Sequence, residues 1–347
     1  MLSELYACPD CCGKLEQETS GYRCISCLKE YPIIENIPVF GNLSTYYGEV
    51  ERQTMEELIK STIINGHEKA ITNIIKEPFV VKYVLDESRA LWTNLLPISA
   101  HTRVVDVGCG WGTVSIPIAR KAGYVAALDA TMERVKFVEI RAQLCSLSNI
   151  APVLGSATAL PFPGESFDII AFNGVLEWLG AINTKEPPLK IQMKALSEAY
   201  RVLKPGGLIY VGIENRYSLR YFLGQADDHS FIRFTSLMPR WMAQIYCKMR
   251  TSNDYFMHTH SLPVYRKMLN SAGFSKVNEY HPWPTYRNPI EFVELETYSI
   301  KMHLREKARL EPVISRKWMY IQLLKLVSAL DKQGLFCHSF SFIYKKS

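Results

Sequence analysis

The stretch RVVDVGCGWGTVSIPIARKAGYVAALD, from Arg103 to Asp129, decides the fold of this chain. Residues 103–107 are an apolar run typical of a buried strand, and glycines follow at 108, 110 and 112. Residues 114–122 predict a helix, and residues 124–128 predict a second strand ending in an aspartate. The stretch therefore predicts a strand–helix–strand unit with a glycine-rich first turn, the usual place for a nucleotide-like ligand. Glycine suits that turn because a side chain would keep the backbone from closing on the ligand.

The spacing of the glycines indicates which ligand the turn binds. A dinucleotide fingerprint, G-x-G-x-x-G, would need a further glycine at Thr113 or Ser115. The chain instead has D-x-G-x-G-x-G from Asp106 to Gly112, which resembles motif I of the class I S-adenosylmethionine (SAM) methyltransferases. That resemblance implies that the strand-end acid and the glycine loop hold the methionine part of SAM. It also implies that Asp129 binds the ribose, since a carboxylate can accept two hydrogen bonds from a vicinal diol.

Further motifs of that family follow in order between about residues 100 and 214. They are LPFP at 160–163 with SFD at 166–168, NGVLEW at 173–178 and RVLKPGG at 201–207. The resemblance implies an α/β fold with a Rossmann-like, seven-stranded class I methyltransferase sheet, and SAM as cofactor. Ser156 departs from the family pattern, in which an acid often accepts from the adenine amino group. The cofactor-binding residues implied are Asp106, Gly108, Cys109, Gly110, Gly112, Asp129, Ala130, Thr131, Ser156, Ala157, Asn173 and Gly174.

The first 41 residues predict a small zinc-binding module. Cys8, Cys11, Cys24 and Cys27 form two CxxC pairs, and four thiolates at this spacing predict a closed tetrahedral structural zinc site. A redox role is disfavoured because neither pair begins a helix after a strand. The segment resembles the small zinc-ribbon proteins that activate tRNA and protein methyltransferases as partner subunits. A closed four-cysteine site has no open coordination position, so no catalysis is expected there.

Composition places the whole chain in the globular class. Its 347 residues are 48% hydrophobic and 21% charged, which suits two domains. No segment approaches 18 consecutive apolar residues, so no membrane-spanning helix is expected. The start MLSELYACPDCC lacks the basic and apolar regions of a secretory signal, so no such signal is expected. Nine cysteines, four of them in CxxC pairs, suit a reducing compartment, so a cytoplasmic location is expected.

The remaining domains are expected at 42–100, 101–214 and 215–347. Residues 42–100 predict a helical linker or cofactor lid with helices at 49–64, 67–76 and from Pro78 to about Leu96. Asp86, Arg89 and Trp92 would share one helical face, either as part of the lid or as a surface ion pair. Residues 101–214 are the SAM-binding core, and 215–347 hold substrate-side insertions and the last two strands, near 276–281 and 339–344.

An insertion at 215–260 is rich in histidine, arginine and aromatic residues, which is typical of a functional loop. Positioning of donor and acceptor supplies most of the acceleration in methyl transfer, but a hydroxyl acceptor must also lose its proton. His229 is the first candidate for the base, with Asp228 or Asp227 orienting it. The alternative catalytic candidates are His260 and Glu214.

Motifs in this C-terminal region carry a second resemblance. ENR at 214–216, YFLG at 221–224 and DDH at 227–229 are followed by HTHSLPVYRKMLNSAGF at 258–274 and PTYRNP at 284–289. Together they resemble methyltransferases encoded with bacterial surface-polysaccharide and related glycan pathways. The resemblance implies O-methylation of a sugar, a glycan or another small-molecule hydroxyl.

Two other functions stay open on the sequence. The ribbon and a basic tail favour RNA-base methylation. However, strand four is followed by Asn173-Gly174 instead of the N/D-P-P-Y/F loop of many amino-group methylating enzymes, and no basic-aromatic platform is evident, so nucleic acid is not favoured. A non-catalytic binding module would predict a degraded cofactor loop, which this chain does not have.

The C-terminal tail carries the excess of positive charge. Residues 301–347 have ten Lys or Arg against three Asp or Glu, and the chain as a whole has a net charge of +6. A broadly apolar helix is expected at 314–330. It could lie on a membrane surface or bind a protein partner, or it could simply pack on the catalytic domain.

Overall fold

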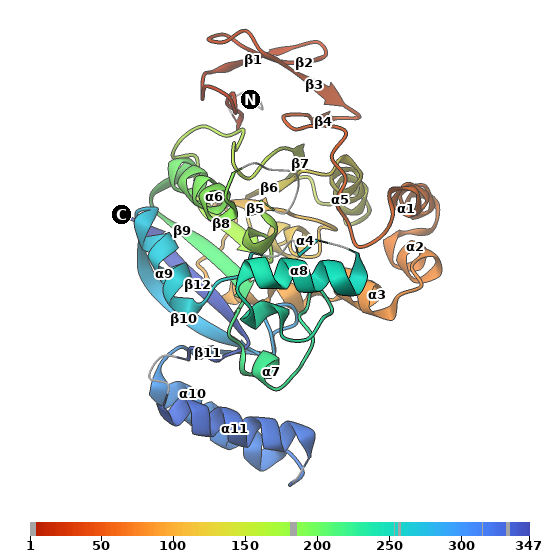
Figure 1. Ribbon diagram of the computed structural model, residues 1–347. Coiled ribbons are helices and arrows are strands. Elements are labelled where there is room, and N and C mark those ends of the chain that lie inside the picture. The colour runs from red at the N-terminus through yellow and green to blue at the C-terminus, as the bar shows by residue number, and fades with distance from the viewer. Residues whose placement is uncertain (1–4, 181–185, 253, 256–257, 314, 331–333) are drawn as a thin grey trace. The chain divides into compact units, whose positions relative to one another are not determined.

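The computed structural model describes residues 1–347 except 1–4, 181–185, 253, 256–257, 314 and 331–333 (Figure 1). The chain divides into two compact units. Unit 1 comprises residues 1–173, 194–210 and 345–347, and unit 2 comprises 174–193 and 211–344. This division differs from the boundaries expected from the sequence. It joins the ribbon, the N-terminal helices and the first strands in unit 1, and it assigns 174–193 and 211–214 to unit 2.

The ribbon in unit 1 is an antiparallel sheet in the order β1-β2-β3-β4. Its strands are β1 (Leu15–Glu18), β2 (Gly21–Cys24), β3 (Glu30–Ile34) and β4 (Ile37–Pro38). The ribbon is not the separate module expected from its length. Phe40 N donates to Leu154 O at 2.8 Å, and Ile37 and Val39 pack with Met132 and Val135. The apolar surface that a forty-residue module cannot bury by itself is thus buried against its own unit.

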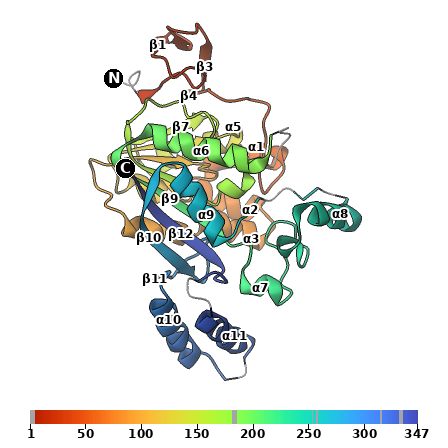
Figure 2. The same ribbon diagram turned by 60° about the vertical axis from the view of Figure 1, so that its left-hand side comes forward.

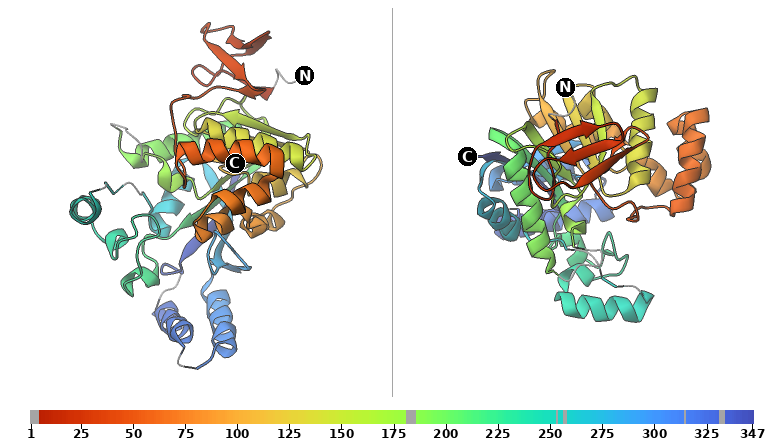
Figure 3. Two further views of the ribbon diagram at one scale, coloured as in Figure 1. Left: turned by 90° about the vertical axis from the view of Figure 1, so that its right-hand side faces the viewer. Right: turned by 90° about the horizontal axis from the view of Figure 1, so that it is seen from above.

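Helices follow the ribbon in unit 1, namely α1 (Arg52–Asn65), α2 (His67–Ile74), α3 (Pro78–Leu85) and the 3-10 helix η2 (Glu87–Leu95). The single helix expected from Pro78 to about Leu96 is wrong. It ends at Leu85, and the Asp86 side chain then accepts from Ser88 N at 3.0 Å and begins η2. The helix α1 packs against α2 and α5 (Figure 3, left). Their shared core contains Met55, Leu58, Ile71, Ile75, Val80, Val84, Trp111 and Phe137.

The sheet of unit 1 has the strand order β9-β8-β5-β6-β7. Its strands are β5 (Arg103–Val107), β6 (Tyr124–Asp129), β7 (Ile150–Leu154), β8 (Phe167–Asn173) and the first part of β9 (Leu203–Glu214). The β5–β6, β5–β8 and β6–β7 pairs are parallel, as expected for strand–helix–strand units. The helices between them are α4 (Ser115–Ala119), α5 (Met132–Leu144) and α6 (Pro188–Val202). The α4 helix is shorter than expected, and β9 begins at Leu203, before the Gly206-Gly207 turn.

Unit 2 contains the strand order β11-β10-β12-β9, with β9 running through both units. Its strands are the end of β9, β10 (Phe274–Trp283), β11 (Glu291–Glu294) and most of β12 (Ser339–Lys346). Among the described residues the large sheet thus has eight strands, β5 to β12, where seven were expected. The extra strand is β11, which pairs antiparallel with β10.

The helices of unit 2 lie mainly in the insertions. They are η3 (Leu176–Trp178), α7 (Leu219–Phe222), η4 (Thr235–Leu237), α8 (Arg240–Thr251), α9 (Leu262–Ser271), α10 (Thr297–Leu310) and α11 (Arg316–Leu330). The helix expected at 314–330 is α11, which packs along α10. Among the described residues, no helix combines the length and the hydropathy needed to cross a membrane.

Candidate functional site

The glycine loop of unit 1 has the backbone shape that its sequence predicts. Gly108, Gly110 and Gly112 have φ values of +69°, +53° and +75°, in the left-handed region that favours glycine. Gly108 N and Cys109 N both donate to Leu128 O, at 2.7 and 3.0 Å. These bonds hold the loop against the end of β6.

Asp129 closes this loop with its side chain. Its Oδ2 accepts from Gly110 N at 3.0 Å, and its Oδ1 accepts from Thr131 N at 2.9 Å. Each carboxylate oxygen can accept a second hydrogen bond. Asp129 is therefore held in place and retains accepting capacity for hydroxyl donors such as those of a ribose.

Asp106, at the end of β5, is a buried acid in the same loop. Its Oδ2 accepts from Ser115 Oγ at 2.5 Å. Burial raises the pKa of Asp106 to about 7, although the Ser115 hydrogen bond and the nearby Arg89 charge oppose this rise. The carboxyl group can therefore exchange a proton near neutral pH.

Arg89 is a buried cation close enough to Asp106 to lower its pKa. Its side chain lies over the Tyr83 ring at 3.7 Å, and the residue is only 6% exposed. The Nε and Nη1 atoms of Arg89 have no hydrogen-bond partner among the described residues. A buried guanidinium with free donors favours an anionic ligand, because unpaired buried charges are costly.

Asp86 and Trp92, which were expected to share a helical face with Arg89, have structural roles. Asp86 lies outside both flanking helices and caps η2. Trp92 is fully buried and stacks on Tyr210 at 3.9 Å between ring centroids, so it belongs to the core. Arg89 has two side-chain nitrogens without a partner among the described residues, and Trp92 Nε1 also has none but lies inside the core.

The remaining cofactor candidates lie as follows. Thr131 is buried after Asp129 and Ala130, and the exposed Ser156 pairs with Thr158, their hydroxyl oxygens 2.9 Å apart, beside the buried Ala157. Asn173 ends β8, and both polar atoms of its buried side chain lack a partner among the described residues. Gly174 is the first residue of unit 2; its N donates to Gly212 O at 2.8 Å.

Unit 2 contains a buried cluster formed by Glu177, Glu214, His229, Tyr286 and Arg287, hereafter the acid–histidine cluster. His229 Nε2 lies 3.5 Å from Glu214 Oε1, and Arg287 Nη2 donates to the same oxygen at 2.5 Å. The Tyr286 hydroxyl donates to Glu214 Oε1 at 3.0 Å, and Glu177 Oε1 lies 3.4 Å from the same hydroxyl oxygen. The cluster brings together groups that can accept, donate and hold a proton.

The two carboxyl groups of the cluster ionise differently. Burial, followed by the charge of Glu214, raises the pKa of Glu177 well above its ordinary value. Burial also works to raise the pKa of Glu214, but Arg287 and His229 outweigh it and hold that pKa well below the ordinary value. Glu177 is therefore the protonated member and Glu214 the carboxylate, as expected when two buried acids share a site.

Glu177, Glu214 and His229 also offer ligand atoms within 4.8 Å of one another, a spacing that could hold a metal ion. Arg287 already neutralises Glu214, however, and a guanidinium opposes a cation at the same oxygen. The arrangement therefore suits proton transfer better than metal binding.

Glu214, and not an aspartate of the DDH motif, is the carboxylate beside the His229 ring. Asp228 forms an ion pair with Arg220 and accepts from the Tyr221 hydroxyl at 3.2 Å. Asp227 Oδ1 accepts from the backbone N–H of His229 at 2.9 Å, so it shapes the turn that carries the histidine. The proposed role of Asp228 as a partner of the ring is thus replaced by that of Glu214.

His260 is held in a different environment within the same unit. Its Nε2 lies 2.7 Å from Gln192 Oε1. Burial, followed by the charges of Arg240 and Arg216, lowers the pKa of His260 to about 3. Such a weak base is poorly matched to proton removal near neutral pH, and its contacts are those of a structural residue.

Sequence reasoning did not single out Glu177, Tyr286 or Arg287 for the cluster. Glu177 lies in the loop after β8, and Tyr286 and Arg287 belong to the quoted PTYRNP motif. The signal that could have found them is this motif, where an aromatic residue and an arginine lie between two prolines. Their pairing with Glu214, 72 and 73 residues away in sequence, had no local signature.

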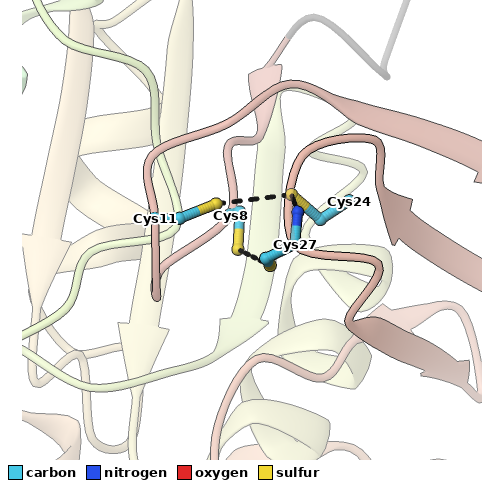
Figure 4. Close-up of side chains that lie close together, drawn as sticks. All are labelled: Cys8, Cys11, Cys24 and Cys27. Carbon is cyan, nitrogen blue, oxygen red and sulfur yellow. Dashed lines mark hydrogen bonds between the residues drawn. The ribbon is translucent and has the colours of Figure 1, made fainter.

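The four ribbon cysteines converge in unit 1 (Figure 4). Their sulfur atoms all lie within 4.8 Å of one another, and none of these cysteines forms a disulfide. Cys8 Sγ also lies 3.1 Å from the Tyr31 hydroxyl. Four convergent thiols of this kind are the donor set of a tetrahedral structural zinc site.

Comparison with known proteins supports a SAM-dependent methyltransferase domain. Residues 105–211 match the family model described as "Methyltransferase domain". The chain is 34% identical over 117 residues to a demethylmenaquinone methyltransferase of Listeria welshimeri, covering 33% of this chain and 45% of that protein. It is 29% identical over 182 residues to the ubiquinone/menaquinone biosynthesis C-methyltransferase UbiE of Roseobacter denitrificans, covering 50% and 67%. The chain thus spans about half the length of the first curated relatives it matches.

Solved structures that are similar to this chain include a putative sarcosine dimethylglycine methyltransferase from Galdieria sulphuraria. The two are 16% identical, with a TM-score of 0.45, covering 85% of this chain and 98% of that one. The YcgJ protein from Bacillus subtilis is 18% identical, with a TM-score of 0.42, covering 74% and 97%.

Proposed function

We propose that this protein transfers a methyl group from SAM to a hydroxyl of a sugar, a glycan or another small molecule. The observation that carries the proposal is the glycine loop between Asp106 and Gly112, closed by Asp129, with the buried Arg89 close enough to lower the pKa of Asp106 and holding two nitrogens without a partner among the described residues. SAM supplies an electrophilic methyl group on a sulfonium. Asp129 and Arg89 offer separate groups for the diol and the carboxylate of that molecule.

The donor would be held by residues of unit 1. Asp129 would accept from the ribose hydroxyls through the free lone pairs of its two oxygens. Arg89 would donate to the methionine carboxylate, which matches its two free nitrogen donors. Asn173, whose amide is buried without a partner, would offer one donor and one acceptor at the end of β8.

The acceptor would be activated by the acid–histidine cluster. Glu177 follows the end of β8 by four residues, and Glu214 ends β9. Ligands of open α/β sheets bind beyond the carboxyl ends of the strands, which favours this cluster as the acceptor side. His229 would take the hydroxyl proton as the methyl group is transferred, and Glu214 would stabilise the resulting imidazolium.

Methylation of a hydroquinone ring carbon is a second candidate. It is favoured by the curated relatives, which are named as demethylmenaquinone and ubiquinone/menaquinone methyltransferases. Loss of a phenolic proton would make the ring carbon nucleophilic, so His229 would have the same task. The two candidates are distinguished by a reaction with SAM that carries an isotope-labelled methyl group. NMR of the product then shows whether the label is in an O-methyl ether or on a ring carbon.

The ribbon, we propose, holds one structural zinc ion on Cys8, Cys11, Cys24 and Cys27. The mutual distances of the four sulfurs and the absence of disulfides among them support this assignment. Four protein ligands would close the coordination sphere, so the ion would stabilise the ribbon and take no part in catalysis.

Calorimetric titration with S-adenosylhomocysteine tests the donor site directly. We expect binding to the full chain, and we expect Asp129→Ala to weaken it by about 10- to 100-fold through lost hydrogen bonds to a charged acceptor. Glu139→Ala is the matched control, since the Glu139 carboxylate accepts from Gln143 Nε2 of the same helix, α5, at 2.8 Å. No binding by the full chain would overturn the methyltransferase proposal, and unchanged affinity in Asp129→Ala would overturn the ribose role.

Arg89→Gln tests the proposed carboxylate contact. We expect affinity for S-adenosylhomocysteine to fall by about 10- to 100-fold, because a charge-assisted hydrogen bond is lost. Affinity for 5′-methylthioadenosine, which has no carboxylate, should change little. Lys82→Gln on the exposed side of α3 controls for the loss of one positive charge. An equal loss of affinity for both ligands would mean that Arg89 acts only through the structure of the loop.

A further inference from the structure

Helix α8, whose ribbon is labelled in Figure 2, exposes an apolar stripe on the side opposite its buried residues. At about 100° per residue, Trp241, Met242, Ile245 and Met249 fall within one arc of about 100°. Their exposed fractions are 67%, 41%, 54% and 79%. Ala243 and Cys247 lie on the other side of the helix and are buried. The stripe is therefore not needed for packing within unit 2.

Two phenylalanines extend this apolar surface. Phe231 and Phe234 are 79% and 43% exposed, and they precede η4, which packs against α8. Both have left-handed backbone conformations, with φ of +56° and +67°. Bulky side chains rarely adopt this region, and strained residues cluster at functional surfaces. The loop thus holds aromatic rings at the surface at a cost in backbone energy.

The charges around this surface are positive. Arg233, Lys248 and Arg250 are exposed, and α8 contains no acidic residue. The Asp227 side chain is buried, and Asp228 is paired with Arg220. Asp254, just beyond the helix, pairs with Lys248 at 3.1 Å. An apolar stripe with tryptophan and flanking basic residues has the composition of a helix that lies in a membrane interface.

We propose that α8, together with Phe231 and Phe234, docks on an anionic lipid surface. The apolar side chains would enter the boundary between headgroups and acyl chains, and the basic residues would pair with lipid phosphates. A second copy of this chain is the less suitable occupant, because the same positive charges would face each other.

The position of His229 in the sequence extends the proposal to the acceptor. His229 lies two residues before Phe231, so the proposed base and the docking surface belong to one segment. We infer that the hydroxyl acceptor is carried by a lipid, an inference that rests on the proposed function. A lipid-carried glycan and a lipid-tailed hydroquinone share this chemistry.

Vesicle flotation of the full chain tests the docking surface. We expect the chain to bind phosphatidylcholine vesicles that contain phosphatidylglycerol, and to bind pure phosphatidylcholine less. The variant Trp241→Ser/Ile245→Ser/Met249→Ser should lower the partition coefficient at least about tenfold, because each apolar side chain contributes free energy when it leaves water. The control is Ile63→Ser/Ile64→Ser on α1, where two isoleucines are 63% and 80% exposed.

The outcomes separate docking from methyl transfer. Unchanged vesicle binding by the triple variant, or equal binding to neutral and anionic vesicles, would overturn the docking proposal. The docking proposal would also be overturned if the full chain did not bind vesicles and instead formed a dimer, seen by light scattering, that was a monomer in the triple variant. Affinity for S-adenosylhomocysteine should be unchanged in the triple variant, which shows that it folds. If vesicle binding fails while that affinity is normal, the methyltransferase proposal stands and the lipid-carried acceptor falls.

Discussion

Replacement of His229 by alanine is expected to lower kcat by about 10²- to 10⁴-fold, the contribution usual for a positioned general base. The imidazole is the side chain of the acid–histidine cluster that would accept the proton, and its Nε2 lies 3.5 Å from the Glu214 carboxylate. Affinity for S-adenosylhomocysteine should be unchanged, since the residues proposed to bind it lie in unit 1. Both quantities can be measured with labelled SAM once an acceptor is in hand.

Controls for this prediction come from the same chain. His101→Ala, at an exposed loop position, should leave kcat unchanged. Glu214→Gln should lower kcat and alter its pH profile, because the amide cannot stabilise an imidazolium as a carboxylate does. Asp228→Asn should leave that pH profile unaltered, since Asp228 pairs with Arg220 and not with the ring. A His229→Ala enzyme with nearly full kcat would exclude His229 as the base.

Removal of the proposed zinc ion is expected to unfold the ribbon. Structural zinc sites contribute about 10–16 kcal/mol of apparent binding free energy, which is also folding free energy for a small module. Metal analysis should find about one zinc ion per chain, bound by Cys8, Cys11, Cys24 and Cys27. Chelation, or the Cys24→Ser substitution, should remove the bound zinc and expose residues 8–40 to hydrogen exchange.

Cys12→Ser is the matched control for the zinc prediction. Cys12 is exposed and lies beside Cys11, but it is not among the four cysteines whose sulfurs converge. Its replacement should leave the zinc content unchanged. A metal-free chain with a fully protected ribbon would contradict the assignment. Loss of zinc in Cys12→Ser would show that the ligand set is different.

The methyltransferase activity that remains in the metal-free chain would show how far the cofactor loop depends on contacts between the ribbon and the rest of unit 1. The ribbon is bound to the core by Ala7 N–Pro161 O and Phe40 N–Leu154 O hydrogen bonds. Its end also covers Met132 and Val135 of α5, the helix that follows Asp129. Loss of these contacts would therefore reach the cofactor loop through α5.

Local sequence determined the strand–helix–strand unit and its glycine loop. The apolar run at 103–107 and the glycines at 108, 110 and 112 require no distant partner, because strand periodicity and positive φ are local properties. The β5 strand was therefore predicted to the residue, and Asp129 was predicted at the end of β6. The convergence of the four cysteines was also predictable, since each CxxC pair is short and the two pairs flank a short hairpin.

Tertiary structure decided the partners of the charged residues. Asp228 or Asp227 was the expected partner of His229, yet Glu214, fifteen residues earlier, lies beside the ring. Arg287 and Tyr286 reach Glu214 from a distant loop, and the ionisation of Glu177 and Glu214 follows from their shared burial. Pairing and desolvation depend on which segments the fold brings together. A local pattern can therefore nominate a titratable residue, but only the folded chain selects its partner and sets its pKa.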